Sequence, residues 1–258
     1  PEPCRISVPV LKKVDGQWSS SIESIEFFYP HLWFAKVVES GLMSTVFGAT
    51  AEKVPEFWDQ VQPDDPRLYK NPILEIANWK KLFVPFQYHG DLAPHQKHDG
   101  IDSDSIRSLL TLQAVDVSML LLSSVPDACR SSNKKCKELR IPFLGDTDEC
   151  IGKHLQWSFN ALFEGRHPTF DADNNPSTDP KAGQYLDPVH NFRGIIWVAP
   201  ADNEHNSKKY GLPHHAAKNR CMDCPCNTSD IPWNDVSKHA LWRQCIYSAD
   251  DKFHVRDN

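Results

Sequence analysis

Cysteine and histidine residues gather between positions 214 and 245, and these are the residue types that bind zinc. Cys221 and Cys224 are separated by two residues, a spacing at which a tight turn brings both thiolates to one tetrahedral ion. The remaining ligands would come from the neighbouring residues His214, His215, Cys226, His239 and Cys245. We predict a structural zinc site with the candidate ligands Cys221, Cys224, His214, Cys226 and Cys245; a redox pair and buried free thiols are the alternatives.

A second set of candidate residues is acidic. Asp91 follows the end of a predicted strand, and Asp202 follows another, with Glu204 two residues further on. Carboxylates at the ends of adjacent strands can converge on Mg²⁺, which activates water and stabilises the phosphorus centre in phosphodiester chemistry. We predict Asp91, Asp202 and Glu204 as a catalytic magnesium site. The alternative is that both aspartates are ordinary turn residues.

Several other functional motifs are absent from the sequence. It contains no Gly-x-Gly-x-x-Gly, no Walker A motif, no Gly-x-Ser-x-Gly and no His-Glu-x-x-His. Asp171-x-Asp173-x-Asn175 begins like a calcium loop, but Pro176 replaces its turn glycine and Ala182 its bidentate glutamate. The nucleotide-binding, serine-hydrolase, zincin and EF-hand classes therefore have no local support.

Helix signals occur at three places along the chain. Pro30 and Gly41 bracket residues 31–40, where apolar side chains recur at helical spacing. Residues 51–61 form a second predicted helix, and residues 151–163 form a third that ends at Gly165. Residues 130–137 and 208–220 are rich in lysine and arginine, and solvent-exposed loops are their simplest interpretation.

Two segments have the pattern of β-strands. Residues 82–88 alternate in hydrophobicity, and residues 194–198 form the continuous apolar run of a strand that is covered on both faces. We predict loops at 94–104 and 171–184, whereas 109–125 could be one or two strands or a core helix. Pro85 lies inside the first strand, where its missing N–H would break the ladder of a central strand.

The length and composition of the chain limit the fold classes to which it can belong. The chain has 258 residues, of which 40% are hydrophobic, with 20 prolines, 11 glycines and a mean hydropathy of −0.50. These values predict a mixed, loop-rich α/β protein. We assign residues 1–70 to a mainly helical region, 71–205 to an α/β core and 206–258 to a segment like a zinc knuckle.

The charge and the cysteines bear on partners and compartment. A formal charge of −6 provides no overall attraction to DNA, so DNA binding would need a local basic surface. No apolar run is long enough to span a membrane. The eight cysteines are scattered or clustered like metal ligands in a long chain, which predicts a reducing, intracellular compartment, with the nucleus as one location.

The order of several motifs resembles that of a known set of proteins. These motifs are His89-Gly90-Asp91, Leu155-Gln-Trp157-Ser158-Phe159 with Leu162 and Gly165, Asp202-x-Glu204, Gly211-Leu212-Pro213-His214 and Cys221-x2-Cys224. Over residues 50–245 the chain is similar to uncharacterised, highly repeated proteins from dinoflagellate-type protist genomes that look derived from mobile elements. The resemblance implies a ribonuclease-H-like transposase or integrase core with a zinc knuckle.

In a core of that kind the first catalytic aspartate lies at the end of the first strand and the second after the fourth. The resemblance thus assigns these roles to Asp91 and Asp202, with Glu204 or Asp235 as the third acid. The leading hypothesis is a nuclease or transposase-like domain that uses magnesium to act on DNA phosphodiesters. The alternative is a zinc-stabilised interaction module without catalysis.

Overall fold

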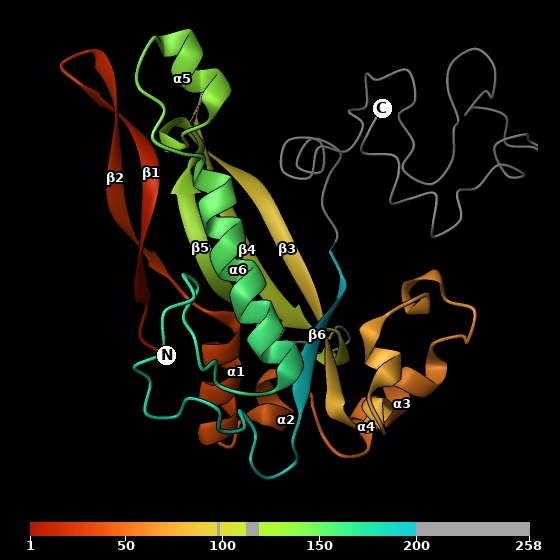
Figure 1. Ribbon diagram of the computed structural model, residues 1–258. Coiled ribbons are helices and arrows are strands. Elements are labelled where there is room, and N and C mark those ends of the chain that lie inside the picture. Colours follow the sequence, from red (N-terminus) through yellow and green to blue (C-terminus); the bar gives the residue numbers. More distant parts are fainter. Residues whose placement is uncertain (97–98, 112–118, 200–258) are drawn as a thin grey trace, which may run out of the picture. The chain divides into compact units, whose positions relative to one another are not determined.

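The computed structural model describes residues 1–96, 99–111 and 119–199, which form a mixed α/β structure (Figure 1). Its strands are β1 (Cys4–Val14), β2 (Gln17–Phe27), β3 (Phe83–Gln96), β4 (Asp99–Ser108), β5 (Leu120–Pro126) and β6 (Arg193–Val198). Its α-helices are α1 (Pro30–Glu39), α2 (Met43–Val46), α3 (Lys53–Gln60), α4 (Trp79–Leu82), α5 (Asn133–Leu139) and α6 (Thr147–Glu164). Within these ranges no helix has the length and apolar character that crossing a membrane would need.

The chain divides into two units, one made of residues 1–63 and 72–200, the other of residues 64–71 and 201–258. All of the helices and strands labelled in Figure 1 belong to the first unit. The predicted zinc segment, 206–258, lies outside the described residues.

The chain begins with a β-hairpin, so the prediction of a mainly helical region over residues 1–70 is wrong for its first 27 residues. Strands β1 and β2 pair antiparallel up to Val14 and Gln17, which leaves a two-residue turn. The turn residues Asp15 and Gly16 both have positive φ, at 50° and 82°. Asp-Gly is a strong sequence signal for a tight hairpin turn. The hairpin forms here although apolar and polar residues alternate only weakly in the two flanking strands.

The three predicted helices are confirmed. Helix α1 begins at Pro30 and is followed by Gly41, which has a φ of 67°. Helix α3 lies within the predicted range 51–61. Helix α6 begins four residues before the predicted Ile151 because Asp146 caps it, accepting hydrogen bonds from the backbone N–H groups of Asp148 (2.9 Å) and Glu149 (3.2 Å).

The central sheet has four strands in the order β5-β4-β3-β6. Strand β4 pairs antiparallel with both β3 and β5, whereas β6 pairs parallel with β3. The predicted strands at 82–88 and 194–198 are confirmed, and β5 supplies one strand of the ambiguous segment 109–125. The predicted loop at 94–104 is wrong, since β3 continues to Gln96 and β4 begins at Asp99.

Pro85 is compatible with this sheet. It lies opposite Ile195 of β6, and the pairing of β3 with β4 starts only at the next residue, Phe86 opposite Ser108. Pro85 therefore has a neighbouring strand on one side, and its missing N–H removes no bond to β4.

Helix α6 covers one face of the sheet (Figure 1). Tyr88 of β3 contacts Phe159 of α6 edge-to-face, with ring centroids 6.0 Å apart. Gly194 of β6 lies so close to the helix that an added Cβ atom would be 2.7 Å from Leu162 and 2.8 Å from Phe86. Gly194 is thus the residue that lets α6 approach β6, and α6 fixes the position of the two strands that lead toward the predicted acids.

A cluster of three tryptophans, one of them in α3, packs beside the start of β3. Trp58 is fully buried, packs against Trp79 and Trp197, and donates a hydrogen bond of 2.7 Å from Nε1 to the carbonyl oxygen of Phe83. This bond satisfies the indole N–H in the core.

Candidate functional site

Asp91 is the one predicted catalytic residue within the described part of the chain, and it lies inside a strand. It pairs with Ser103 of β4, and β3 continues for five residues beyond it to Gln96. The prediction that the strand ends at Asp91 is wrong because β4 provides a partner along this whole length. The last pairing of β3 with β6 is Gln87 opposite Val198, so Asp91 lies beyond the end of β6.

Asp202 and Glu204 lie outside the described residues, as do His214, Cys221, Cys224, Cys226 and Cys245. Within residues 1–96, 99–111 and 119–199 no group of three or more histidine, cysteine or acidic side chains is arranged to hold a metal. The four cysteines in this part are free thiols at Cys4, Cys129, Cys136 and Cys150. Both metal sites therefore stay predictions.

The face of β3 and β4 that lies away from α6 is polar next to Asp91. Gln87 and Arg107 face each other in the ladder, and the Arg107 Nε donates to the Gln87 Oε1 at 3.0 Å. The next pair is His89 with Ser105, whose hydroxyl donates to the His89 carbonyl oxygen at 3.3 Å. Sequence reasoning missed these β4 residues because it placed them in or after a loop.

On the opposite face a carboxylate is buried. Asp104 of β4 is 2% exposed and accepts hydrogen bonds from the hydroxyl groups of Tyr88 and Ser123, the latter at 2.7 Å. A buried carboxylate needs such donors because it has lost its hydration. Asp104 therefore joins β3, β4 and β5 through their side chains, and both of its oxygens are engaged.

A buried arginine connects this sheet to α6. Arg130 forms ion pairs with Asp102 of β4 and Asp148 in the first turn of α6. Burial lowers the pKa of Arg130 to about 10, and the nearby carboxylate of Asp146 acts in the opposite direction. The prediction that 130–137 is a solvent-exposed basic loop is wrong, since Arg130 is 7% exposed and α5 begins at Asn133.

A histidine and a serine meet in the core in a way that does not support nucleophilic catalysis. The Nδ1 atom of His31 lies 2.7 Å from the hydroxyl of Ser158, but both side chains are buried and Ser158 is fully inaccessible. Burial, reinforced by His167, lowers the pKa of His31 to about 3, so the ring is neutral in the folded protein at neutral pH.

This shift predicts a pH dependence of stability. The unfolded chain takes up a proton on His31 near pH 6.5 and the folded chain near pH 3, so protonation favours unfolding as the pH falls between these values. From pH 7 to pH 5 we expect this residue to reduce the free energy of unfolding by about 2 kcal/mol. Urea unfolding at both pH values measures the loss.

The matched variants are His31→Gln and His190→Gln, because the His190 side chain is 54% exposed. His31→Gln should be less stable at pH 7 and lose less stability on acidification, whereas His190→Gln should behave like the wild type. An equal loss between pH 7 and pH 5 in all three proteins would contradict the role of His31.

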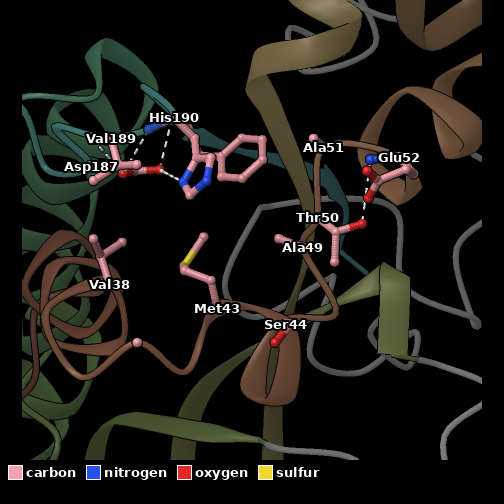
Figure 2. Close-up of a pocket in the computed structure, with 12 residues that line it drawn as sticks. Val38, Met43, Ser44, Ala49, Thr50, Ala51, Glu52, Asp187, Val189 and His190 are labelled. Carbon is pink, nitrogen blue, oxygen red and sulfur yellow. Dashed lines mark hydrogen bonds and ion pairs between the residues drawn. The ribbon is translucent and has the colours of Figure 1, made fainter.

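A cavity of about 510 Å³ lies between the end of α1, α2 and the segments 49–52 and 187–192. Figure 2 shows Asp187 and His190 on one wall and Thr50 and Glu52 on the other. The Asp187 carboxylate accepts from the backbone N–H groups of Val189 (3.0 Å), His190 (3.1 Å) and Phe192 (3.3 Å). Asp187 therefore fixes the shape of its own loop.

The cavity has few side chains that could take part in a reaction. The hydroxyl of Thr50 lowers the pKa of the exposed Glu52, and the His190 ring stacks on Phe192 with centroids 5.2 Å apart. Val38, Met43 and Ala49 make the rest of the lining largely apolar. No residue of β3, the strand that carries Asp91, is among those that line the cavity, and Asp187 and Glu52 form hydrogen bonds within their own loops.

Comparison with protein-family models, with curated proteins and with solved structures gave no match.

Proposed function

We propose that this chain is a magnesium-dependent nuclease or DNA strand transferase, derived from a mobile element, with a ribonuclease-H-like core. The observation that carries the proposal is the parallel pairing of β3 with β6 up to Gln87 and Val198. Asp91 follows Gln87 by four residues, and Asp202 follows Val198 by four residues in the sequence. The two aspartates are thus equally far along the chain from a paired position.

Neighbouring strands lie about 4.8 Å apart, and parallel strands carry equivalent residues toward the same edge of a sheet. Two chain segments that leave a paired position in the same direction can bring their fourth residues close together. Two carboxylates so placed repel each other unless a cation lies between them. We propose that Asp91 and Asp202 hold Mg²⁺, with Glu204 as a further acid.

The strand order supports the same proposal. Strands β3, β4 and β5 form an antiparallel run, and after α5 and α6 the fourth strand, β6, returns beside the first. A ribonuclease-H-like core carries its first acid on the first strand and its second after the fourth, so these two strands must be neighbours. Bound magnesium would supply an activated water and stabilise the charge at phosphorus.

The experiment is cleavage of a labelled DNA duplex by the purified chain in Mg²⁺, in Mn²⁺ and without added divalent metal. We expect products with either metal and none without it. A chain that leaves DNA intact under all three conditions would contradict the proposal and favour the non-catalytic interaction module.

The zinc site is a separate part of the proposal. We expect about one zinc ion per chain by mass spectrometry, because four ligands from the cluster at 214–245 complete one tetrahedral site. Cys221→Ser and Cys224→Ser should each lose most of the metal, whereas Cys4→Ser, which changes a free thiol of β1, should keep it. Wild-type protein without zinc, or with zinc unaffected by the two variants, would rule out this site.

A further inference from the structure

Arg107 differs from Arg67 and Arg130 in the partner that its guanidinium has. Its Nε donates to the amide oxygen of Gln87 at 3.0 Å, and this amide is the only hydrogen-bonding or ion-pairing partner of the Arg107 side chain among the described residues. Arg67 and Arg130, in contrast, pair with carboxylates. The structure thus shows no carboxylate within its described residues that compensates the positive charge of Arg107.

The surroundings of Arg107 favour a bound anion. Gln87 is 6% exposed, and the Arg107 side chain is half-buried against it. The hydrogen bond uses Nε, and the terminal nitrogens of the guanidinium have no partner in the described part of the chain, so they could bind a second, planar acceptor. Partial burial strengthens the attraction between such a cation and an anion, because less water screens the charge.

The position of Arg107 connects it to the proposed catalytic site. Along the ladder from Gln87 and Arg107 come His89 with Ser105 and then Asp91 with Ser103. Four residues of a strand extend about 13 Å, which is the axial length of roughly four base pairs of duplex DNA. A phosphate at Arg107 and the reacting phosphate near Asp91 would therefore fit on one DNA substrate.

We propose that Arg107, oriented by Gln87, binds a backbone phosphate of the DNA substrate about four base pairs from the reacting phosphodiester. The proposal rests on the proposed function for its choice of DNA as the anion. It also supplies the local positive charge that a chain with a formal charge of −6 needs for DNA binding.

The test is fluorescence anisotropy of a labelled DNA duplex with the full chain in buffer without added Mg²⁺, so that binding is measured without cleavage and the proposed zinc ion is kept. Arg107→Gln should weaken binding about tenfold and reduce the slope of log affinity against log salt by about 0.9, the value for one lost phosphate contact. The matched control is Arg5→Gln, which removes an exposed arginine from β1 and should leave the affinity and the slope unchanged.

A second variant tests the site without removing the arginine. Gln87→Glu keeps the size of the side chain and gives Arg107 a carboxylate partner, so it should weaken DNA binding by a similar factor. Unchanged affinity in both variants, or a wild-type chain that does not bind DNA, would overturn the proposal.

The proposed function can fail separately. If Arg107→Gln and Gln87→Glu weaken binding but the wild type cleaves no DNA, then the phosphate site stands and the nuclease proposal fails. If metal-dependent cleavage is observed but neither variant affects binding, then only the role of Arg107 is rejected.

Discussion

Replacing Asp91 with asparagine is expected to reduce magnesium-dependent DNA cleavage by at least about a hundredfold. Changes to outer-shell partners of a metal already cost roughly 10–100-fold, and loss of a direct carboxylate ligand should cost more. Asparagine keeps the size of the side chain but removes the charge that would hold the cation. The ladder pairing of Asp91 with Ser103 uses backbone atoms, so the strand should form as in the wild type.

Initial rates of cleavage at saturating DNA measure this effect. The matched control is Asp15→Asn, because Asp15 is an exposed turn residue whose φ of 50° is also accessible to asparagine. The control should retain wild-type activity and DNA affinity. Equal activity of Asp91→Asn and Asp15→Asn would contradict a catalytic role for Asp91.

The largest effect on stability is expected at Arg130. Arg130→Met should reduce the free energy of unfolding by about 3–5 kcal/mol, because it removes the guanidinium that forms an ion pair with the largely buried carboxylate of Asp102. The Asp102 side chain is 11% exposed and the Asp148 side chain 40% exposed, so the cost arises mainly at Asp102. Denaturant unfolding followed by circular dichroism measures the loss.

A second substitution separates the charge from the packing. Adding Asp102→Asn to Arg130→Met removes the negative charge that Arg130 balances in the wild type and should recover part of the lost stability. The surface control Arg5→Met should change the free energy of unfolding by less than about 0.5 kcal/mol. A loss below about 1 kcal/mol in Arg130→Met, or no recovery in the double variant, would contradict the account of this buried cluster.

Helices whose ends are marked by proline or glycine could be predicted from the sequence. Helix α1 lies between Pro30 and Gly41, and α6 ends at Gly165, whose φ of 69° suits a helix C-terminus. The short apolar run of β6 was also recognisable. These segments contain their own signals, because caps and hydrophobic spacing are local properties of the chain.

Strand β4 could not be predicted in this way. Its sequence from Asp99 to Ser108 is polar, and it contains the buried Asp104 and the ion-paired Asp102. Acidic residues usually indicate a solvent-exposed loop, whereas partners such as Tyr88, Ser123 and Arg130 make a buried strand possible here. These partners are far away in the sequence, so local patterns carry no information about them.

The candidate site follows the same division. Asp91 could be recognised from the sequence as an acid next to a strand. The continuation of that strand to Gln96 could not, because it depends on pairing with β4. Arg107 had no sequence signal, because its importance depends on a neutral partner across the ladder. Spacing identifies residues that can do chemistry, whereas the sheet determines which of them lie together.

The most direct test of the central claim is a double-mutant cycle for cleavage by Asp91→Asn, Asp202→Asn and the combined variant. If the two aspartates hold the same metal, each single substitution should abolish most of the activity, and the combination should cost little more than either alone. A combined variant whose loss of activity equals the product of the two single losses would contradict a shared metal site. Full activity of either single variant would contradict it as well.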